Sequence, residues 1–129
     1  PAAVARFAED TDLSGRIPVP VLTVKGVDDP TAFVELDAYF KGTMERGGSG
    51  ARLVQTFTQH ATHSYLSDPT YPTLMAALLR WVDAGDKPTP QGVARQCPSF
   101  EATFGKGCAF LPAYVPAPLE SRVAPRERP

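Results

Sequence analysis

Apolar residues gather in two short runs that are typical of β-strands. The first, residues 19–27 (VPVLTVKGV), is rich in β-branched residues and nearly continuously apolar. That pattern favours a strand covered on both faces in a parallel sheet, and Pro20 is tolerated because it lies near the start of the strand. The second run, residues 51–58 (ARLVQTFT), predicts another strand, with Leu53, Val54 and Phe57 as its apolar content.

Two longer segments show the three- and four-residue spacing of amphipathic helices. We expect the first helix from Thr31 to Arg46, ended by the glycine-rich residues 47–50. Its predicted apolar stripe consists of Phe33, Leu36, Phe40 and Met44. The second helix is expected over residues 72–85, with a proline in its first turn and Gly85 as its stop. Its predicted apolar face consists of Leu74, Leu78, Trp81 and Val82.

The order of these elements is strand, helix, strand, helix, which indicates parallel strands joined by crossover helices. Residues 1–9 are Ala-rich and are expected to be the last turns of a further helix. Two parallel strands cannot bury both of their own faces, and parallel sheets need more strands than this. The predicted fold class is therefore α/β, and these strands are expected to be the edge of a larger, mostly parallel sheet whose remainder lies elsewhere.

From Lys87 onward the pattern changes to a Pro-rich segment without clear periodicity. We expect two parts: residues 1–88 as the α/β part and residues 89–129 as an irregular extension. The aromatic residues of the extension favour an extended segment that lies on the surface of the first part. These residues are Phe100, Phe104, Phe110 and Tyr114.

The extension also holds both cysteines, Cys97 and Cys108. A disulfide between them would close a loop of about a dozen residues and stabilise the chain by roughly 2 to 4 kcal/mol. Such a bond predicts an oxidising compartment, so we expect a secreted or periplasmic protein. The alternative is two unpaired, buried thiols in a cytosolic chain. We expect no metal site, because no CxxC pair or nearby histidine completes a ligand set.

Composition excludes several classes of protein. The chain has 129 residues, of which 43 % are apolar and 21 % charged, as in one ordinary globular domain. Its net charge is −1 with scattered charges, so no nucleic-acid partner is expected. No apolar run is long enough to span a bilayer, so no membrane partner is expected either. We expect Arg122, Arg126 and Arg128 to belong to a solvated tail, because proline and glutamate interrupt them. A start at Pro1 without a leader predicts a processed product or a truncated sequence.

Candidate chemistry lies just after each predicted strand. Asp28 and Asp29 follow the first strand, and His60 and His63 follow the second. The carboxyl ends of parallel strands meet at one edge of the sheet, where α/β proteins place their sites. A carboxylate there can hold an imidazole in the tautomer that acts as a general base toward a hydroxyl. The alternative is an aspartate that only caps the next helix and a histidine that is only a polar loop residue.

Three stretches together resemble the last third of an α/β-hydrolase. They are PVPVLTVKGVDDPTAFVELDAYF, ARLVQTFTQHATHSYLSD and LMAALLRWVDAGDKP, and the resemblance covers roughly residues 12–88. It implies strand seven, the acid turn, a helix, strand eight, the histidine loop and the closing helix. The segment RWVDAGDKP is also similar to tannase- and feruloyl-esterase-like hydrolases, without indicating a substrate. No cofactor is implied.

The resemblance also implies roles for single residues. The acid of that family commonly follows strand seven in a G-x-x-D turn, and the turn from Gly26 places the match on Asp29 rather than Asp28. The family histidine lies a few residues before the final helix, which fits His63 better than His60. The sequence departs from the family at Thr62, where members often have glycine before the histidine.

The nucleophile that this mechanism needs is a serine on a G-x-S-x-G turn between a strand and a helix. Ser49 in GGSGA does not fit, because Ala51 replaces the closing glycine and the stretch follows a helix. Ser64 is too close to the histidine in sequence. Since the family order is serine, acid, histidine, we expect the serine upstream of residue 1, in another chain of the same precursor.

Together these observations predict the acid- and histidine-supplying chain of a two-chain, processed serine hydrolase. Its substrate would be a small-molecule carboxylic ester, or less well an amide or a lactone. The alternative from another class is a non-catalytic, hydrolase-like chain for binding or assembly, in which Asp29 and His63 are relics.

Overall fold

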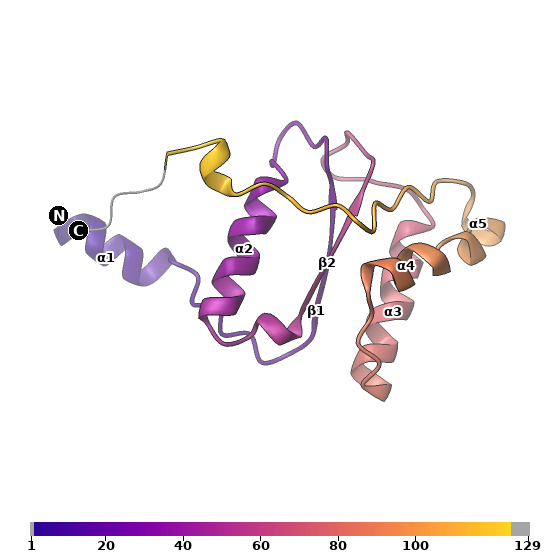
Figure 1. Cartoon of the computed structure of the whole chain (residues 1–129), viewed down its shortest axis with the longest axis horizontal. Helices are drawn as coiled ribbons and strands as arrows, with labels where there is room; N and C mark the ends of the chain where they lie inside the picture. The colour runs from indigo at the N-terminus through magenta and orange to yellow at the C-terminus, as the bar shows by residue number, and fades with distance from the viewer. Residues whose placement is uncertain (1, 125–129) are drawn as a thin grey trace.

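The structure, a computed structural model, describes residues 2–124 and has the mixed α/β organisation that the sequence predicts (Figure 1). Its helices are α1 (Ala2–Thr11), α2 (Glu35–Arg46), α3 (Thr70–Ala84), α4 (Pro90–Gln96) and α5 (Pro98–Phe104). Its strands are β1 (Val21–Gly26) and β2 (Leu53–Thr58). Two 3-10 turns, η1 (Gly50–Arg52) and η2 (Leu119–Ser121), complete the elements.

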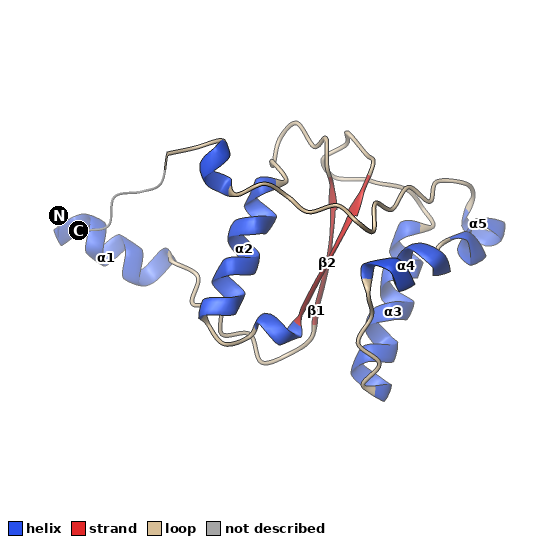
Figure 2. Ribbon diagram, in the orientation of Figure 1, coloured by secondary structure: helices blue, strands red, loops and turns tan. Residues whose placement is uncertain are grey.

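The two strands pair in parallel, as the alternation of strands and helices predicts. Their register runs from Val21 opposite Leu53 to Gly26 opposite Thr58. Helix α2 lies on one side of this sheet, and α3 and α4 lie on the other (Figure 2). Each strand begins two residues later than expected, and α2 begins four residues later because residues 30–34 form a turn instead of a helical start.

The C-terminal segment covers the outer edge of β2 at the carboxyl end of the strand. The Gln59 N–H donates to the carbonyl oxygen of Ala109, and the Leu111 N–H donates to the carbonyl oxygen of Phe57, both at 2.8 Å. An antiparallel bridge joins Thr58 to Phe110 between these bonds. Every residue of β2 except Gln55 is buried.

Strand β1 has a different environment. Its residues Val21–Lys25 are only half-buried, and no strand pairs with its other edge within residues 2–124. Helices lie on both faces of the sheet (Figure 2). The strand is nevertheless less buried than expected, because one of its edges has no neighbouring strand in the described part of the chain.

Helix α3 packs through small side chains rather than through the predicted apolar face. Its buried residues are Thr70, Thr73 and Ala77, which let the helix approach β1 closely. Leu74, Leu78 and Trp81 lie at the border of the buried face of α3 and are half-buried, whereas Val82 is 58 % exposed. Four apolar residues at helical spacing form an exposed stripe, which we call the α3 stripe: Tyr71, Met75, Leu79 and Val82.

The extension contains two helices, so its predicted irregularity is wrong for residues 90–104. Helix α4 starts at Pro90, and the Thr89 hydroxyl caps it by accepting the Gly92 N–H at 3.0 Å. Helix α5 likewise starts at a proline, Pro98. Proline at the first helical position is favourable, since its missing N–H would have no partner there. The fully buried Val93 anchors α4.

Beyond Phe104 the extension does run as an irregular segment across the molecule (Figure 1). The Cys97–Cys108 disulfide is formed, with the Cα atoms 5.9 Å apart, and it ties the end of α4 to the segment that covers β2. Arg122 is not simply solvated, because its Nε lies 3.0 Å from the Glu35 carboxylate. Arg126 and Arg128 lie outside the described residues. No helix of residues 2–124 is long and apolar enough to cross a membrane.

Candidate active site

The turn after β1 holds Asp29 in a fixed orientation. Its Oδ1 accepts the backbone N–H groups of Thr31 at 2.8 Å and Ala32 at 3.1 Å. Its Oδ2 accepts the Lys25 ammonium at 2.6 Å. Asp29 is only 8 % exposed, so these donors replace the water that an ionised carboxylate would otherwise bind.

His63 reaches the same carboxylate from the loop after β2. Its Nδ1 lies 3.0 Å from Oδ2 and 3.2 Å from Oδ1 of Asp29. The parallel register explains this meeting, because both strands end at the same edge of the sheet. The side chain of His63 is 49 % exposed. With Nδ1–H donating to the carboxylate, Nε2 carries the lone pair that can take a proton from a substrate or a nucleophile.

The charges around the pair keep the acid ionised. The Lys25 ammonium holds the pKa of Asp29 far below its usual range, assisted by the N–H groups of Ala32 and Thr31 and by His63, whereas burial acts in the opposite direction. Lys25 also faces Asp37 of α2, whose pKa is raised by burial and partly lowered again by this lysine. Asp29 therefore acts as a fixed negative charge and not as a proton donor.

The neighbouring candidates take other positions. Asp28 is exposed and accepts a hydrogen bond from the side chain of Gln59. The buried Nδ1 of His60 has no hydrogen-bond partner among the described residues. The His60 carbonyl accepts the Asp28 N–H at 3.2 Å, so His60 connects the two loops through its backbone. Of the four candidates, the structure joins Asp29 and His63 through their side chains.

The glycine of the G-x-x-D turn is required by the close approach of these two loops. A Cβ on Gly26 would lie 2.7 Å from the carbonyl oxygen of His60, which is closer than real Cβ contacts come. Gly26 is itself the last residue of β1 and pairs with Thr58. The residue therefore sets the distance between the acid turn and the histidine loop.

The site lacks a nucleophile within residues 2–124. Ser49 is buried near the opposite end of β2, where its Oγ accepts the Ile17 N–H at 3.0 Å. Ser64 is exposed beside the histidine. In this part of the chain no hydroxyl or thiol forms a hydrogen bond with His63. No group of histidine, cysteine and carboxylate side chains in the described ranges could hold a metal ion.

Sequence reasoning missed Lys25 as a member of the site. The available signal was a single charged residue inside an apolar strand, four residues before the acid. The strand geometry alone does not reveal that the ammonium turns toward the carboxylate, because the following turn decides where Asp29 lies.

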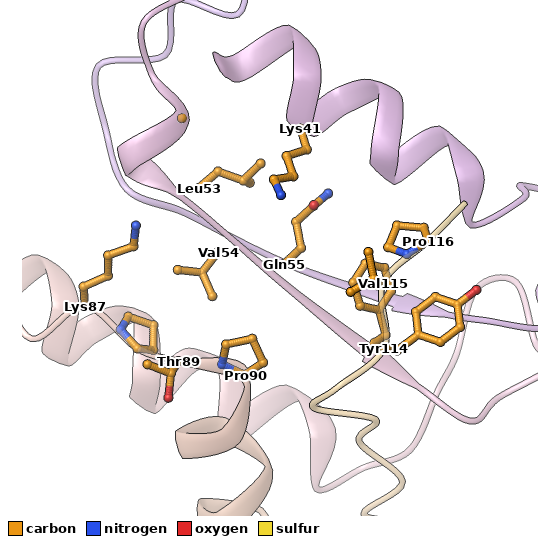
Figure 3. A pocket seen from close by; sticks show the side chains of 13 residues that line it. Lys41, Leu53, Val54, Gln55, Lys87, Thr89, Pro90, Tyr114, Val115 and Pro116 are labelled. Atoms are coloured by element: carbon orange, nitrogen blue, oxygen red, sulfur yellow. The ribbon is translucent and has the colours of Figure 1, made fainter. Parts of the chain in front are cut away.

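A cavity of about 330 Å³ lies at a different place, along the outer edge of β2. Figure 3 shows Lys41 from α2, Val54 from β2, Lys87 before α4 and Tyr114 from the extension around it. Neither Asp29 nor His63 lines this cavity. It is therefore not the place where a substrate would meet the Asp29–His63 pair.

Comparison with known proteins adds no identification. No protein-family model matches the chain, and neither a curated protein nor a solved structure matches it. The described residues form a mixed α/β arrangement with a two-stranded parallel sheet.

Proposed function

We propose that this chain supplies the acid and the base of a serine hydrolase that cleaves carboxylic esters. The observation that carries this proposal is the 3.0 Å contact between Nδ1 of His63 and Oδ2 of the buried Asp29. This is the arrangement in which a carboxylate orients an imidazole and stabilises the imidazolium. It belongs to the C-terminal part of an α/β-hydrolase, whose acid and histidine follow neighbouring strands as they do here.

The reaction follows from the roles of these groups. Nε2 of His63 takes the proton of the serine hydroxyl while its Oγ attacks the ester carbonyl. The imidazolium then gives this proton to the departing alcohol, which leaves an acyl-serine. A water molecule, deprotonated by the same nitrogen, then attacks the acyl group. The bond to the serine Oγ breaks, the imidazolium returns its proton to this oxygen, and the carboxylic acid is released. Asp29 stays ionised throughout and keeps the imidazole oriented.

The serine and the oxyanion donors would come from a second chain, the upstream part of the same precursor. Two features of the described residues support such a partner: the open edge of β1 and the exposed α3 stripe. A further parallel strand on β1 would extend the sheet, and an apolar surface of the partner would cover the stripe. Exposed apolar surface of this kind marks an interaction site.

An active-site probe tests the proposal on the chain purified together with its partner. A fluorophosphonate labels a serine only when a base activates it. We expect the label on a serine of the partner, nearly complete loss in His63→Ala and unchanged labelling in the matched control His60→Ala. Equal labelling of wild type and His63→Ala would contradict the role of His63.

The mass of the purified material tests the two-chain composition. In material purified from the native source, a complex is expected to contain this 13.9 kDa chain and a second chain that carries the labelled serine. Native material that contains the 13.9 kDa species without a second chain would contradict the partner.

The second candidate function is non-catalytic binding or assembly through the same open face. The observation that favours it is the lack of a nucleophile bonded to His63 within residues 2–124. In that case the partner would bind Asp29→Asn and His63→Ala chains as well as wild type, and no serine would be labelled. The disulfide supports a secreted or periplasmic location for either function.

A further inference from the structure

Lys25 is placed where a lysine needs a specific partner. Its side chain is only 16 % exposed, on the face of β1 that looks toward α2. Thr23 lies two residues before Lys25, on the same face of β1, and pairs in register with Gln55 of β2. The side-chain amide of Gln55 donates a hydrogen bond to the Asp37 carbonyl of α2. A nearly buried ammonium is costly unless it is paired. Its partner is Asp29, the candidate catalytic acid. Both side chains are largely buried, so solvent screens this ion pair less than it screens a pair at the surface.

Lys25 and His63 share one oxygen atom. The ammonium lies 2.6 Å and the imidazole Nδ1 3.0 Å from the same Oδ2 of Asp29. The two nitrogens therefore cannot be farther apart than the sum of these distances. When His63 takes up a proton, two positive charges face one carboxylate, so the lysine offsets part of the attraction between Asp29 and the imidazolium.

The other charged groups described near Asp29 and His63 do not place a second cation on the Asp29 carboxylate. Asp28 is exposed and bonded to Gln59, Asp37 faces Lys25 from α2, and His60 lies in the same loop as His63. From the extension, Tyr114 interacts with Asp28, Glu35 and Arg122. Within the described ranges, Lys25 is the only cation hydrogen-bonded to the carboxylate that holds His63.

We propose that Lys25 is a positioning residue: it clamps Asp29 and keeps His63 unprotonated, and so able to act as a base, at more acidic pH than an Asp–His pair alone would allow. The catalytic meaning of this inference rests on the proposed function. Its effect on the imidazole does not, and that effect can be measured on this chain alone.

The direct test follows the ring protons of His63 by NMR as the pH is changed, with His60→Gln to assign the two histidines. In Lys25→Met we expect His63 to take up its proton at higher pH than in wild type, because a neighbouring positive charge is gone. Lys25→Arg keeps the charge and should titrate near wild type. Lys41→Met is the matched control, since Lys41 is an exposed lysine of α2.

A second variant separates charge from packing. Lys25→Gln retains a hydrogen-bond donor but has no charge, and we expect the same upward movement of the titration. An unchanged titration in a folded Met or Gln variant would overturn the proposal. If neither variant folds while Lys25→Arg does, Lys25 serves folding alone and the proposal is equally overturned.

The two proposals can fail independently. In the assembled hydrolase we expect the acid limb of kcat/KM to move to higher pH in Lys25→Met and to return in Lys25→Arg. If serine labelling depends on His63 but the titration of His63 is the same with and without Lys25, the hydrolase proposal stands and the role of Lys25 is contradicted. If Lys25 moves the titration but no serine is ever labelled, the electrostatic role stands and the hydrolase proposal falls.

Discussion

The two strands of the sheet have opposite surroundings along their outer edges. Beside β2 lies the extension, hydrogen-bonded to Phe57 and Gln59 and held by a disulfide and by the small helices α4 and α5. Beside β1 lies no strand of the described chain, and the α3 stripe is also exposed. The Asp29–His63 pair sits between these regions, at the carboxyl ends of both strands.

This difference shows which edge of the sheet is covered within the described chain and which edge is open. An uncovered strand edge invites pairing with another chain, and proteins normally block it with prolines, charges or a covering segment. On the β2 side this chain supplies such a cover. On the β1 side it supplies apolar residues that a partner can cover. Under the proposed function, this chain orients the base and the partner chain supplies the nucleophile.

The largest effect is expected from loosening the covered side. Cys108→Ser removes the disulfide and leaves the buried Cys97 in place. We expect a loss of about 2 to 4 kcal/mol in the free energy of unfolding, because the unfolded chain regains the freedom of the closed loop. Urea denaturation measures it. Reduction of the wild-type chain should give a similar loss, and wild-type stability in the variant would show that α4 and α5 hold the extension without the bond.

A somewhat smaller effect is expected at the junction between the two regions. Gly26→Ala places a methyl group against the His60 carbonyl, and we expect a loss of about 1 to 3 kcal/mol from overpacking. The shift should also lengthen the contact between Asp29 and His63, so the downfield Nδ1–H resonance of His63 should weaken. Gly42→Ala, where only the end of the long Arg46 side chain lies near, is the control and should leave the resonance unchanged without loss of stability.

The covered side should also lose stability in acid through Glu101. Its carboxylate accepts the N–H groups of Gly107 and Cys108, and the Lys106 ammonium chiefly lowers its pKa to about 2. Because the pKa is lower in the folded state, the stabilisation is complete above about pH 4.3, the pKa of an unperturbed glutamate, and is lost as the pH falls toward 2.

Glu101→Gln removes that part of the acid dependence. The melting temperature of the variant should therefore fall less steeply between about pH 4.3 and 2 than that of wild type. Glu120→Gln, at an exposed residue of η2, is the control. Parallel acid curves for wild type and Glu101→Gln would show that the carboxylate does not hold this loop.

The smallest effect on stability is expected on the open side. Met75→Lys and Leu79→Lys place charges on the α3 stripe, and both residues are exposed. We expect the stability of the free chain to change by no more than about 0.5 kcal/mol. Recovery of the partner chain should nevertheless fall sharply, whereas Asp83→Lys, an exposed position of α3 outside the stripe, should leave it intact. Full recovery with both stripe variants would place the partner elsewhere.

Much of the fold could be predicted from periodicity. The parallel strands, α2 and α3 follow from local patterns of apolar residues and from glycine and proline at their ends. The helices α4 and α5 could not be found from periodicity, because each has only seven residues, too few to show a helical repeat. Short helices of this kind form only when tertiary contacts such as those of Val93 stabilise them.

The candidate site shows the same division. Asp28, Asp29, His60 and His63 could be named as candidates because each follows a strand, and strand order determines which loops meet at an edge. The resemblance to α/β-hydrolases then selected Asp29 and His63. The face that α3 buries could not be named, because apolar periodicity locates an apolar stripe but does not say which neighbour covers it. Here the small residues Thr70, Thr73 and Ala77 face the sheet, and larger apolar residues remain exposed.

The order of amino acids thus determined the elements, their parallel arrangement and the two loops that carry the candidate chemistry, since these depend on interactions between near neighbours in the chain. Only the folded arrangement decided that Lys25 joins Asp29, that the extension covers β2, and that β1 and the α3 stripe stay open. These features depend on distances between residues that are remote in sequence or on the exact path of a turn. The stretch GVDDP therefore predicted an acid turn, while the fold supplied its two partners, an ammonium from β1 and an imidazole from beyond β2.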